Sequence, residues 1–249
     1  MTLLIRQFPC LSDNYGFLIR DEATGQVAAV DTPDADAILT ELAASGWGRL
    51  DFIFNTHWHP DHAGGNQRLK DETGCQIIGP EEVRRLAPLD QTVAGPDLVR
   101  LGETEFQILD VGGHTLGHIA WWAPQDAVAF VGDSLFALGC GRMFEGSPDQ
   151  FWSSLERLAA LPPETTVYCA HEYTEANARF ALSVDDDPAV LSRAEAVFAA
   201  RRRGEPTVPT TIAEEVATNP FFRGPLLRPD MSPVEAFAAL RLAKDQFKG

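Results

Sequence analysis

Thr56-His57-Trp58-His59-Pro60-Asp61-His62-Ala63-Gly64-Gly65 is the stretch from which the fold of this chain is best inferred. It places three of the six histidines and an aspartate within one short segment. In an extended chain, residues i and i+2 point to the same side, so His57 and His59 can reach one metal ion. Asp61 and His62 follow at once, and adding both to that ion would crowd its coordination shell. The spacing therefore favours two adjacent ions, each needing three or more protein ligands.

The missing ligands are expected at the ends of other strands. Short apolar runs, each followed by a structure-breaking residue and then a residue of metal-ligand type, occur at Leu50–Phe54, Phe106–Val111, Val128–Val131 and Thr166–Cys169. Such runs predict buried strands, whose carboxyl ends converge at one edge of a sheet. We therefore expect His114, Asp133 and His171 to complete the site. The remaining histidine, His118, has either a supporting or a purely structural role.

Helical segments alternate with these strands in the first part of the chain. They are predicted at Asp34–Ala44, Asn66–Thr73, Glu81–Leu86 and Pro148–Ala160. This alternation indicates an α/β or layered sandwich architecture.

After Tyr173 the sequence predicts helices only. Asp187-Pro188 begins one helix that ends at Gly204, and Ser232-Pro233-Val234-Glu235 is a capping box that begins a final helix reaching about Phe247. A short helix is predicted near Thr211–Ala217. We expect a catalytic domain over residues 1–173 and a helical domain over residues 174–249.

The composition is that of a globular chain of one or two domains, with 249 residues, 45% of them hydrophobic. No apolar run approaches a membrane span and the N-terminal stretch has no signal-peptide pattern, so we expect a cytoplasmic protein, by default a monomer. The net charge of −16 disfavours nucleic acid and membrane as main partners. Cys10, Cys75, Cys140 and Cys169 are expected to be free, buried thiols.

The motif and the segments around it resemble the metallo-β-lactamase superfamily, and within it the glyoxalase II (hydroxyacylglutathione hydrolase) family. The segments that carry the narrower resemblance are Ser12-Asp13-Asn14-Tyr15, Gly113-His114-Thr115-Leu116-Gly117-His118, Gly132-Asp133-Ser134-Leu135-Phe136, the run from Gly139 to Gly146, His171-Glu172-Tyr173-Thr174 and Lys244-Asp245-Gln246-Phe247. They extend over nearly the whole chain.

The resemblance implies an αβ/βα four-layer metallo-β-lactamase sandwich followed by a small C-terminal helical domain. It implies a site with two divalent ions, zinc first and iron or manganese as alternatives, since all three accept imidazole and carboxylate ligands. His57, His59 and His114 would hold one ion, and Asp61, His62 and His171 the other. Asp133 and a hydroxide would bridge the two ions.

The implied reaction is hydrolysis of the thioester of S-(2-hydroxyacyl)glutathione, such as S-D-lactoylglutathione, to glutathione and D-lactate, the second step of methylglyoxal detoxification. Two dications lower the pKa of a bridging water toward about 7, which supplies the attacking hydroxide at neutral pH. Asp61, His62 and Asp133 are the expected catalytic residues.

An anionic glutathione thioester needs a local basic patch on this acidic chain. In the final helix, Arg241 and Lys244 lie beside the apolar stripe of Phe237 and Leu240. By resemblance they bind the glycine carboxylate of glutathione, with Arg142, Phe144 and Tyr173 as further substrate contacts. Arg142 stands where the family often has lysine, and Phe144 where it often has tyrosine, so one hydroxyl contact is lost.

Three alternatives share the first motif. A lactonase or β-lactamase would hydrolyse a lactone or lactam in preference to a thioester, and a persulfide dioxygenase with one iron would consume oxygen. The helical C-terminal region argues against the former, and the presence of both His62 and His171 argues against the latter. A non-catalytic metal-binding protein is disfavoured by the complete ligand set.

Overall fold

The computed structural model describes residues 3–249, which form two compact units. The first unit comprises the described residues up to Asp110 together with Gly117–Gly132, and the second comprises Val111–Leu116 together with Asp133–Gly249. The chain therefore passes from one unit to the other more than once.

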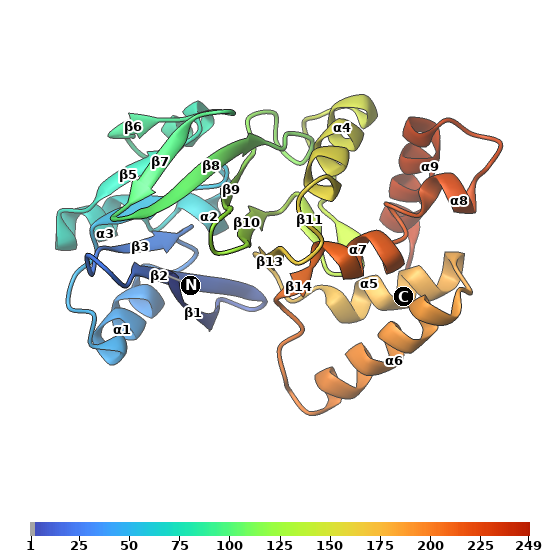
Figure 1. Cartoon of the computed structure of the whole chain (residues 1–249), viewed down its shortest axis with the longest axis horizontal. Helices are drawn as coiled ribbons and strands as arrows, with labels where there is room; N and C mark the ends of the chain where they lie inside the picture. Colours follow the sequence, from blue (N-terminus) through green and yellow to red (C-terminus); the bar gives the residue numbers. More distant parts are fainter. Residues whose placement is uncertain (1–2) are drawn as a thin grey trace. The chain divides into compact units, whose positions relative to one another are not determined.

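Two sheets form the framework of the first unit (Figure 1). The strands of the first sheet, in spatial order, are β1 (Leu3–Cys10), β2 (Asn14–Asp21), β3 (Val27–Val30), β4 (Phe52–Phe54), β5 (Gln76–Gly79) and β6 (Gln91–Thr92). The pairs β1–β2 and β2–β3 are antiparallel, whereas β3 to β6 run parallel. Within this unit the second sheet has the antiparallel strands β7 (Leu98–Leu101), β8 (Thr104–Asp110), β9 (Ile119–Ala123) and β10 (Val128–Gly132).

Alternating side chains of the first sheet divide between two cores. Phe54 faces the second sheet, where its ring stacks on Trp121 with centroids 4.3 Å apart, and Phe17 similarly meets Phe130 at 5.5 Å. Their neighbours Leu18 and Ile53 point to the opposite face and pack in a second apolar cluster. That face is covered by α1 (Ala35–Ser45) and α3 (Asn66–Thr73). The first unit is thus a sandwich of two sheets with a helical layer.

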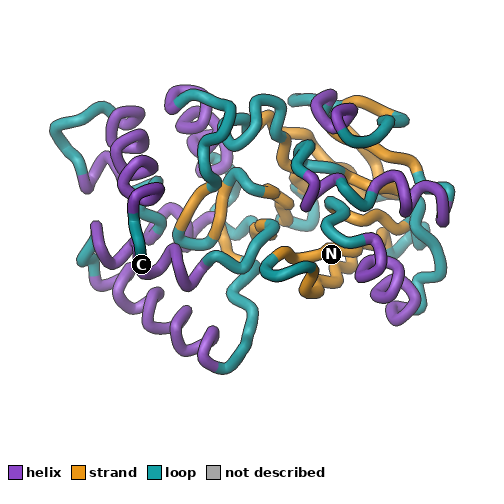
Figure 2. The backbone as a smooth tube through the Cα atoms, turned by 180° about the vertical axis from the view of Figure 1, so that it is seen from behind, coloured by secondary structure: helices purple, strands orange, loops and turns teal. Residues whose placement is uncertain are grey.

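The second unit is mostly helical (Figure 2). Its helices are α4 (Pro148–Ala159), α5 (Thr174–Val184), α6 (Pro188–Arg202), α7 (Ile212–Thr218), α8 (Gly224–Leu227) and α9 (Pro233–Gln246). Two short strand pairs accompany them: β11 (Leu135–Phe136) with β12 (Gly139–Cys140), and β13 (Thr166–Cys169) with β14 (Thr210–Thr211). Leu138, at the tip of the β11–β12 hairpin, is buried in an apolar cluster with α5 and α6.

Most predicted elements are present, with two corrections. The segment predicted as a helix over Glu81–Leu86 forms the 3₁₀-helix η1 (Glu81–Arg85). The expectation of helices only after Tyr173 is wrong at β14, because its two β-branched threonines pair with β13 before Thr211 caps α7. The capping box at Ser232 and Glu235 is confirmed.

The mixed sheets and the C-terminal helices agree with the predicted α/β sandwich followed by a helical region. The division at residue 173 stays a prediction. All four cysteines are free and buried. In residues 3–249, no helix is long and apolar enough to cross a membrane.

Candidate metal and substrate site

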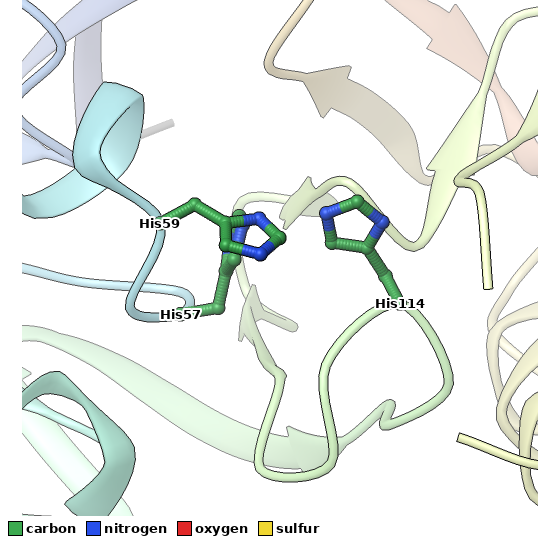
Figure 3. Close-up of side chains that lie close together, drawn as sticks. All are labelled: His57, His59 and His114. Carbon is green, nitrogen blue, oxygen red and sulfur yellow. The ribbon is translucent and has the colours of Figure 1, made fainter. Parts of the chain in front are cut away.

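In the first unit the motif lies where β4 ends and a short helix begins. Strand β4 leads through Asn55 and Thr56 to His57, and the helix α2 (Pro60–Ala63) begins directly after His59. Proline at the first helical position turns the chain here. The side chains of His57 and His59 point toward one another (Figure 3), with Nε2 of His57 3.0 Å from Nδ1 of His59.

Asp31, at the end of β3, orients two of these imidazoles. Its carboxylate accepts hydrogen bonds from the Thr56 backbone N–H at 2.8 Å and the Thr56 hydroxyl at 2.7 Å, and lies 2.8 Å from Nδ1 of His62. The Thr56 hydroxyl oxygen is in turn 3.0 Å from Nδ1 of His57. Both histidines are fully buried, and in each ring these contacts are made by Nδ1, which leaves Nε2 as the nitrogen that could serve a metal.

Asp61 is the one carboxylate within the motif, and its side chain is 39% exposed. Its Oδ2 lies 3.6 Å from Nε2 of His62 and accepts a hydrogen bond from Asn14 Nδ2 at 3.1 Å. His118 is buried and stacks on His57, with ring centroids 4.5 Å apart and planes at 20°. Two roles were predicted for His118, supporting the site or purely structural, and this contact with the proposed ligand His57 favours the supporting role.

The second unit carries His114, Asp133 and His171. The loop after β8 bears His114 (Figure 3), and its Nε2 lies 3.4 Å from Oδ2 of Asp133. The other carboxylate oxygen of Asp133 lies 3.3 Å from Nε2 of His171. Nδ1 of His114 is 2.7 Å from the carbonyl oxygen of Arg142, which makes Nδ1 the donor and Nε2 the nitrogen that could bind a metal.

These distances fit the binding of divalent metal. Two ligand atoms at about 2.1 Å from one tetrahedral ion are themselves about 3.4 Å apart. The two imidazole–carboxylate contacts of Asp133 have this spacing, and each uses a different oxygen, as a bridging carboxylate would. Within the first unit, atoms of the kind that bind metals, one each from Asp31, His57 and His62, lie within 4.8 Å of one another. The chain therefore carries groups of histidine and aspartate suited to hold metal.

Aromatic rings flank the ligands of the second unit. Tyr173 stacks on His171 with centroids 4.6 Å apart and nearly parallel planes. Phe144 packs edge-on against His114 at 5.2 Å, yet it is 60% exposed. The guanidinium of Arg142 lies 5.6 Å from the Phe144 ring.

The basic residues of α9 lie where the sequence predicts, next to the buried Phe237 and Leu240. Arg241 is itself buried, and it donates to the carbonyl of Cys140 at 2.9 Å and to Asp245 at 3.0 Å. Lys244 donates to the carbonyl of Ala176 at 2.8 Å. Burial, with the nearby Arg241 charge, lowers the pKa of Lys244 to about 8.

Sequence reasoning missed two groups that orient ligands. Asp31 follows the buried run Val27–Val30, so the pattern of a strand followed by a ligand-type residue would have found it. The Arg142 carbonyl carries no such signal, since every residue has a backbone oxygen.

Comparison with known proteins defines the class. Residues 28–171 match the metallo-beta-lactamase superfamily. A crystal structure of ETHE1 from Myxococcus xanthus is similar, with a TM-score of 0.71 and 28% identity over 96% of this chain and 90% of that one. The BLEG-1 B3 metallo-beta-lactamase shares the fold, with a TM-score of 0.69 and 20% identity over 89% of this chain and 100% of that one. The class is therefore that of metallo-β-lactamase-fold proteins.

The C-terminal region narrows this class to one family. Residues 172–247 match the hydroxyacylglutathione hydrolase C-terminus. Proteins named hydroxyacylglutathione hydrolase from Erythrobacter litoralis and Maricaulis maris are 54% and 53% identical, over 98% of this chain and 100% and 99% of theirs. The chain belongs to the hydroxyacylglutathione hydrolase family.

Proposed function

We propose that this chain hydrolyses the thioester of S-(2-hydroxyacyl)glutathione, with S-D-lactoylglutathione as substrate and glutathione and D-lactate as products. The observation that carries this proposal is the similarity to hydroxyacylglutathione hydrolases over nearly the whole chain, helical region included. The proposed role is the second step of methylglyoxal detoxification.

The proposed ligand sets are those that the resemblance implies. His57, His59 and His114 would hold one divalent ion, and Asp61, His62 and His171 would hold a second. Asp133 would contribute to both, and zinc is the first candidate. The orientation of His57 and His62 by Asp31, and the contacts of Asp133 within the second unit, support this assignment.

When bound, two divalent ions polarise the thioester carbonyl and provide hydroxide at neutral pH. Asp61, held by Asn14 and partly exposed, orients the attacking water. The bond between acyl carbon and sulfur breaks, the water oxygen joins the acyl carbon, and glutathione leaves as thiolate. Because a thiolate is a good leaving group, the reaction needs no strong protein acid.

We assign substrate binding to residues 174–249 together with Arg142, Phe144 and Tyr173. Arg241 and Lys244 supply positive charge for the glycine carboxylate, against a chain whose net charge is −16. The half-buried ammonium of Lys244 and the exposed guanidinium of Arg142 support this role. We further propose a cytoplasmic monomer whose partner is this small substrate, with no nucleic acid or membrane.

The test compares initial rates for S-D-lactoylglutathione and for a simple thioester without glutathione, using metal-replete protein of measured metal content. Fast turnover with strong preference for the glutathione ester, and two ions per chain, is the expected result. No turnover of either thioester by protein that holds two ions would refute the thioesterase proposal and favour a lactone or another ester.

A further inference from the structure

The β11–β12 hairpin lies between proposed metal ligands and proposed substrate contacts. It follows Asp133 and leads into Gly141 and Arg142. Each of its strands has only two residues, and Leu138 at its tip has a φ of 57°, in the left-handed region. Such a short hairpin is not stable alone, so groups elsewhere must hold it.

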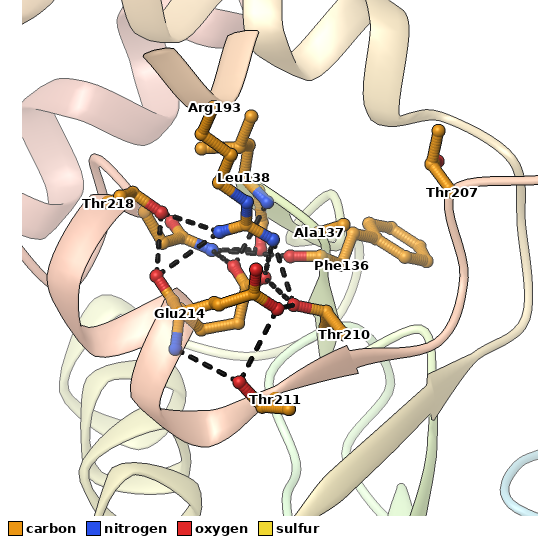
Figure 4. A network of polar contacts seen from close by, with 12 residues as sticks. Phe136, Ala137, Leu138, Arg193, Thr207, Thr210, Thr211, Glu214 and Thr218 are labelled. Carbon is orange, nitrogen blue, oxygen red and sulfur yellow. Dashed lines mark hydrogen bonds and ion pairs between the residues drawn. The ribbon is translucent and has the colours of Figure 1, made fainter. Parts of the chain in front are cut away.

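Side chains of the helical region provide that hold (Figure 4). Oε2 of Glu215, on α7, accepts a hydrogen bond from the backbone N–H of Leu138 at 3.0 Å. Nδ2 of Asn219 lies 2.8 Å from the same Oε2 and also contacts the carbonyl oxygens of Phe136 at 3.2 Å and Gly139 at 2.9 Å. Three backbone groups of the hairpin, the Leu138 N–H and the carbonyls of Phe136 and Gly139, are thus bonded to α7 or to the residue that follows it.

Arg193 on α6 compensates the negative charge of the buried Glu215 carboxylate. Glu215 is fully buried, and its Oε1 forms an ion pair with Arg193 and accepts a hydrogen bond from Thr210 Oγ1 at 2.7 Å. Removing one partner of such a pair leaves an uncompensated buried charge, which is strongly destabilising. Both carboxylate oxygens are used, Oε1 for the ion pair and Oε2 for the hairpin.

The hairpin in turn contacts the proposed metal ligands. A Cβ on Gly141 would lie 1.9 Å from the carbonyl oxygen of Asp133 and 3.1 Å from Nδ1 of His114, so the chain after the hairpin packs directly on both residues. The next residue, Arg142, orients His114 through its carbonyl. The Phe136 ring packs against His171 at 6.0 Å. A shift of the hairpin would therefore move groups around all three ligands.

We propose that Glu215, balanced by Arg193, is a positioning residue that fixes the β11–β12 hairpin and thereby holds His114 and Asp133 in their metal-binding geometry. This inference rests on the proposed function for its kinetic consequence. Glu215 acts through the hairpin and touches neither ligand in the contacts described above.

The test variant is Glu215→Gln, because glutamine has nearly the same size but only one acceptor oxygen. Its NH₂ group must therefore face donors, either those of Arg193 and Thr210 or those of Leu138 and Asn219. The matched control is Asp185→Asn, which breaks a similarly buried pair with Arg223 in the same unit. For Glu215→Gln we expect kcat to fall about 10- to 100-fold, the range for groups that orient metal ligands, with KM changing less. We expect faster metal release to a chromogenic chelator and faster amide hydrogen exchange at Leu138. For Asp185→Asn, kcat and metal release stay within about twofold of wild type while stability falls.

If Glu215→Gln loses stability as Asp185→Asn does, with metal release and kcat unchanged, the positioning role is wrong. If Glu215→Gln does not fold, Asn219→Ala is measured in its place with the same readouts. It removes the contacts to the Phe136 and Gly139 carbonyls, together with those to Glu215 and the Phe221 backbone N–H. A wild type without thioesterase activity would refute the proposed function alone, since metal release and hydrogen exchange still report on the hairpin.

Discussion

The two units hold their proposed ligands in different ways. In the first unit, four proposed ligands lie within six residues of sequence. One carboxylate, Asp31, contacts His62 directly and His57 through the Thr56 hydroxyl. In the second unit, the ligands are far apart in sequence, and their supports are a backbone carbonyl and a small hairpin. A contiguous motif needs only local chain geometry, whereas dispersed ligands depend on the packing of the whole unit.

This difference predicts where substitutions have the largest consequences. Each oxygen of Asp133 faces a different histidine, so its loss disturbs two ligands at once. Each ligand of the contiguous motif has neighbours in the same loop that can retain an ion.

The largest effect is expected for Asp133→Ala. Losing several kcal/mol of transition-state stabilisation lowers kcat by about 10³-fold, and we expect the occupancy of both ions to fall. His59→Ala is the comparison within the motif, with one ion lost and the other kept. Metal content per chain by mass spectrometry and kcat for the glutathione thioester check both variants. If Asp133→Ala retained both ions, Asp133 would not be the residue on which both ions depend, and the contrast with His59 would be wrong.

Next in size is Asp31→Asn. An amide in place of the carboxylate weakens the orientation of His57 and His62, and metal affinity is expected to fall about 10- to 100-fold. Competition with a chelator of known affinity measures this. Asp21→Asn serves as the control, since Asp21 is also buried and bonded to threonine hydroxyls, but these belong to Thr24 and Thr104 rather than to the motif. Equal metal affinity in the two variants would contradict the role of Asp31.

A smaller effect is expected from the titration of Lys244. Because its pKa is about 8, its positive charge is present below that pH and lost above it. KM for the anionic thioester should therefore rise between pH 7 and pH 9.5, by roughly fivefold for a contact of about 1 kcal/mol. In Lys244→Arg, which keeps its charge, the rise should vanish. An identical rise in both proteins would assign it to another group.

The smallest effect is expected for Phe144→Tyr. The ring is largely exposed, so a hydroxyl fits without disturbing its packing on His114. One added hydrogen bond to substrate, about 0.5 kcal/mol, lowers KM roughly twofold. Phe144→Leu, which lacks both ring and hydroxyl, should not lower KM. An unchanged KM in Phe144→Tyr would show that substrate does not reach this ring.

The proposed ligands of both units are easier to pick out in the sequence than the groups that support them. Ligand residues such as His57 and Asp133 follow short apolar runs, and both the runs and the residue types are visible in the sequence. The capping box at Ser232 was equally visible, because its residues interact locally. Strand β14 was missed because its pairing with β13 depends on residues far away in the chain.

Supports of the ligands depend on tertiary structure. Glu215 lies in a segment interpreted only as a short helix, and nothing in the sequence indicates that its carboxylate reaches the Leu138 amide. The Arg142 carbonyl is invisible for the same reason, since its position depends on the hairpin before it. Local patterns predict which residues carry the chemistry, and packing determines how accurately they are held.

The anchoring of the β11–β12 hairpin has a consequence for the order of events during synthesis. Asp133 and the hairpin leave the ribosome early, but Glu215 and Asn219 follow roughly 80 residues later, which is about 4 to 16 s at ordinary elongation rates. During that interval the hairpin lacks its partners, and Leu138 lacks the α5 and α6 residues that bury it. We therefore expect nascent chains stalled before Glu215 to bind metal weakly, and the complete metal centre to form only after Glu215 and Asn219 have been synthesised.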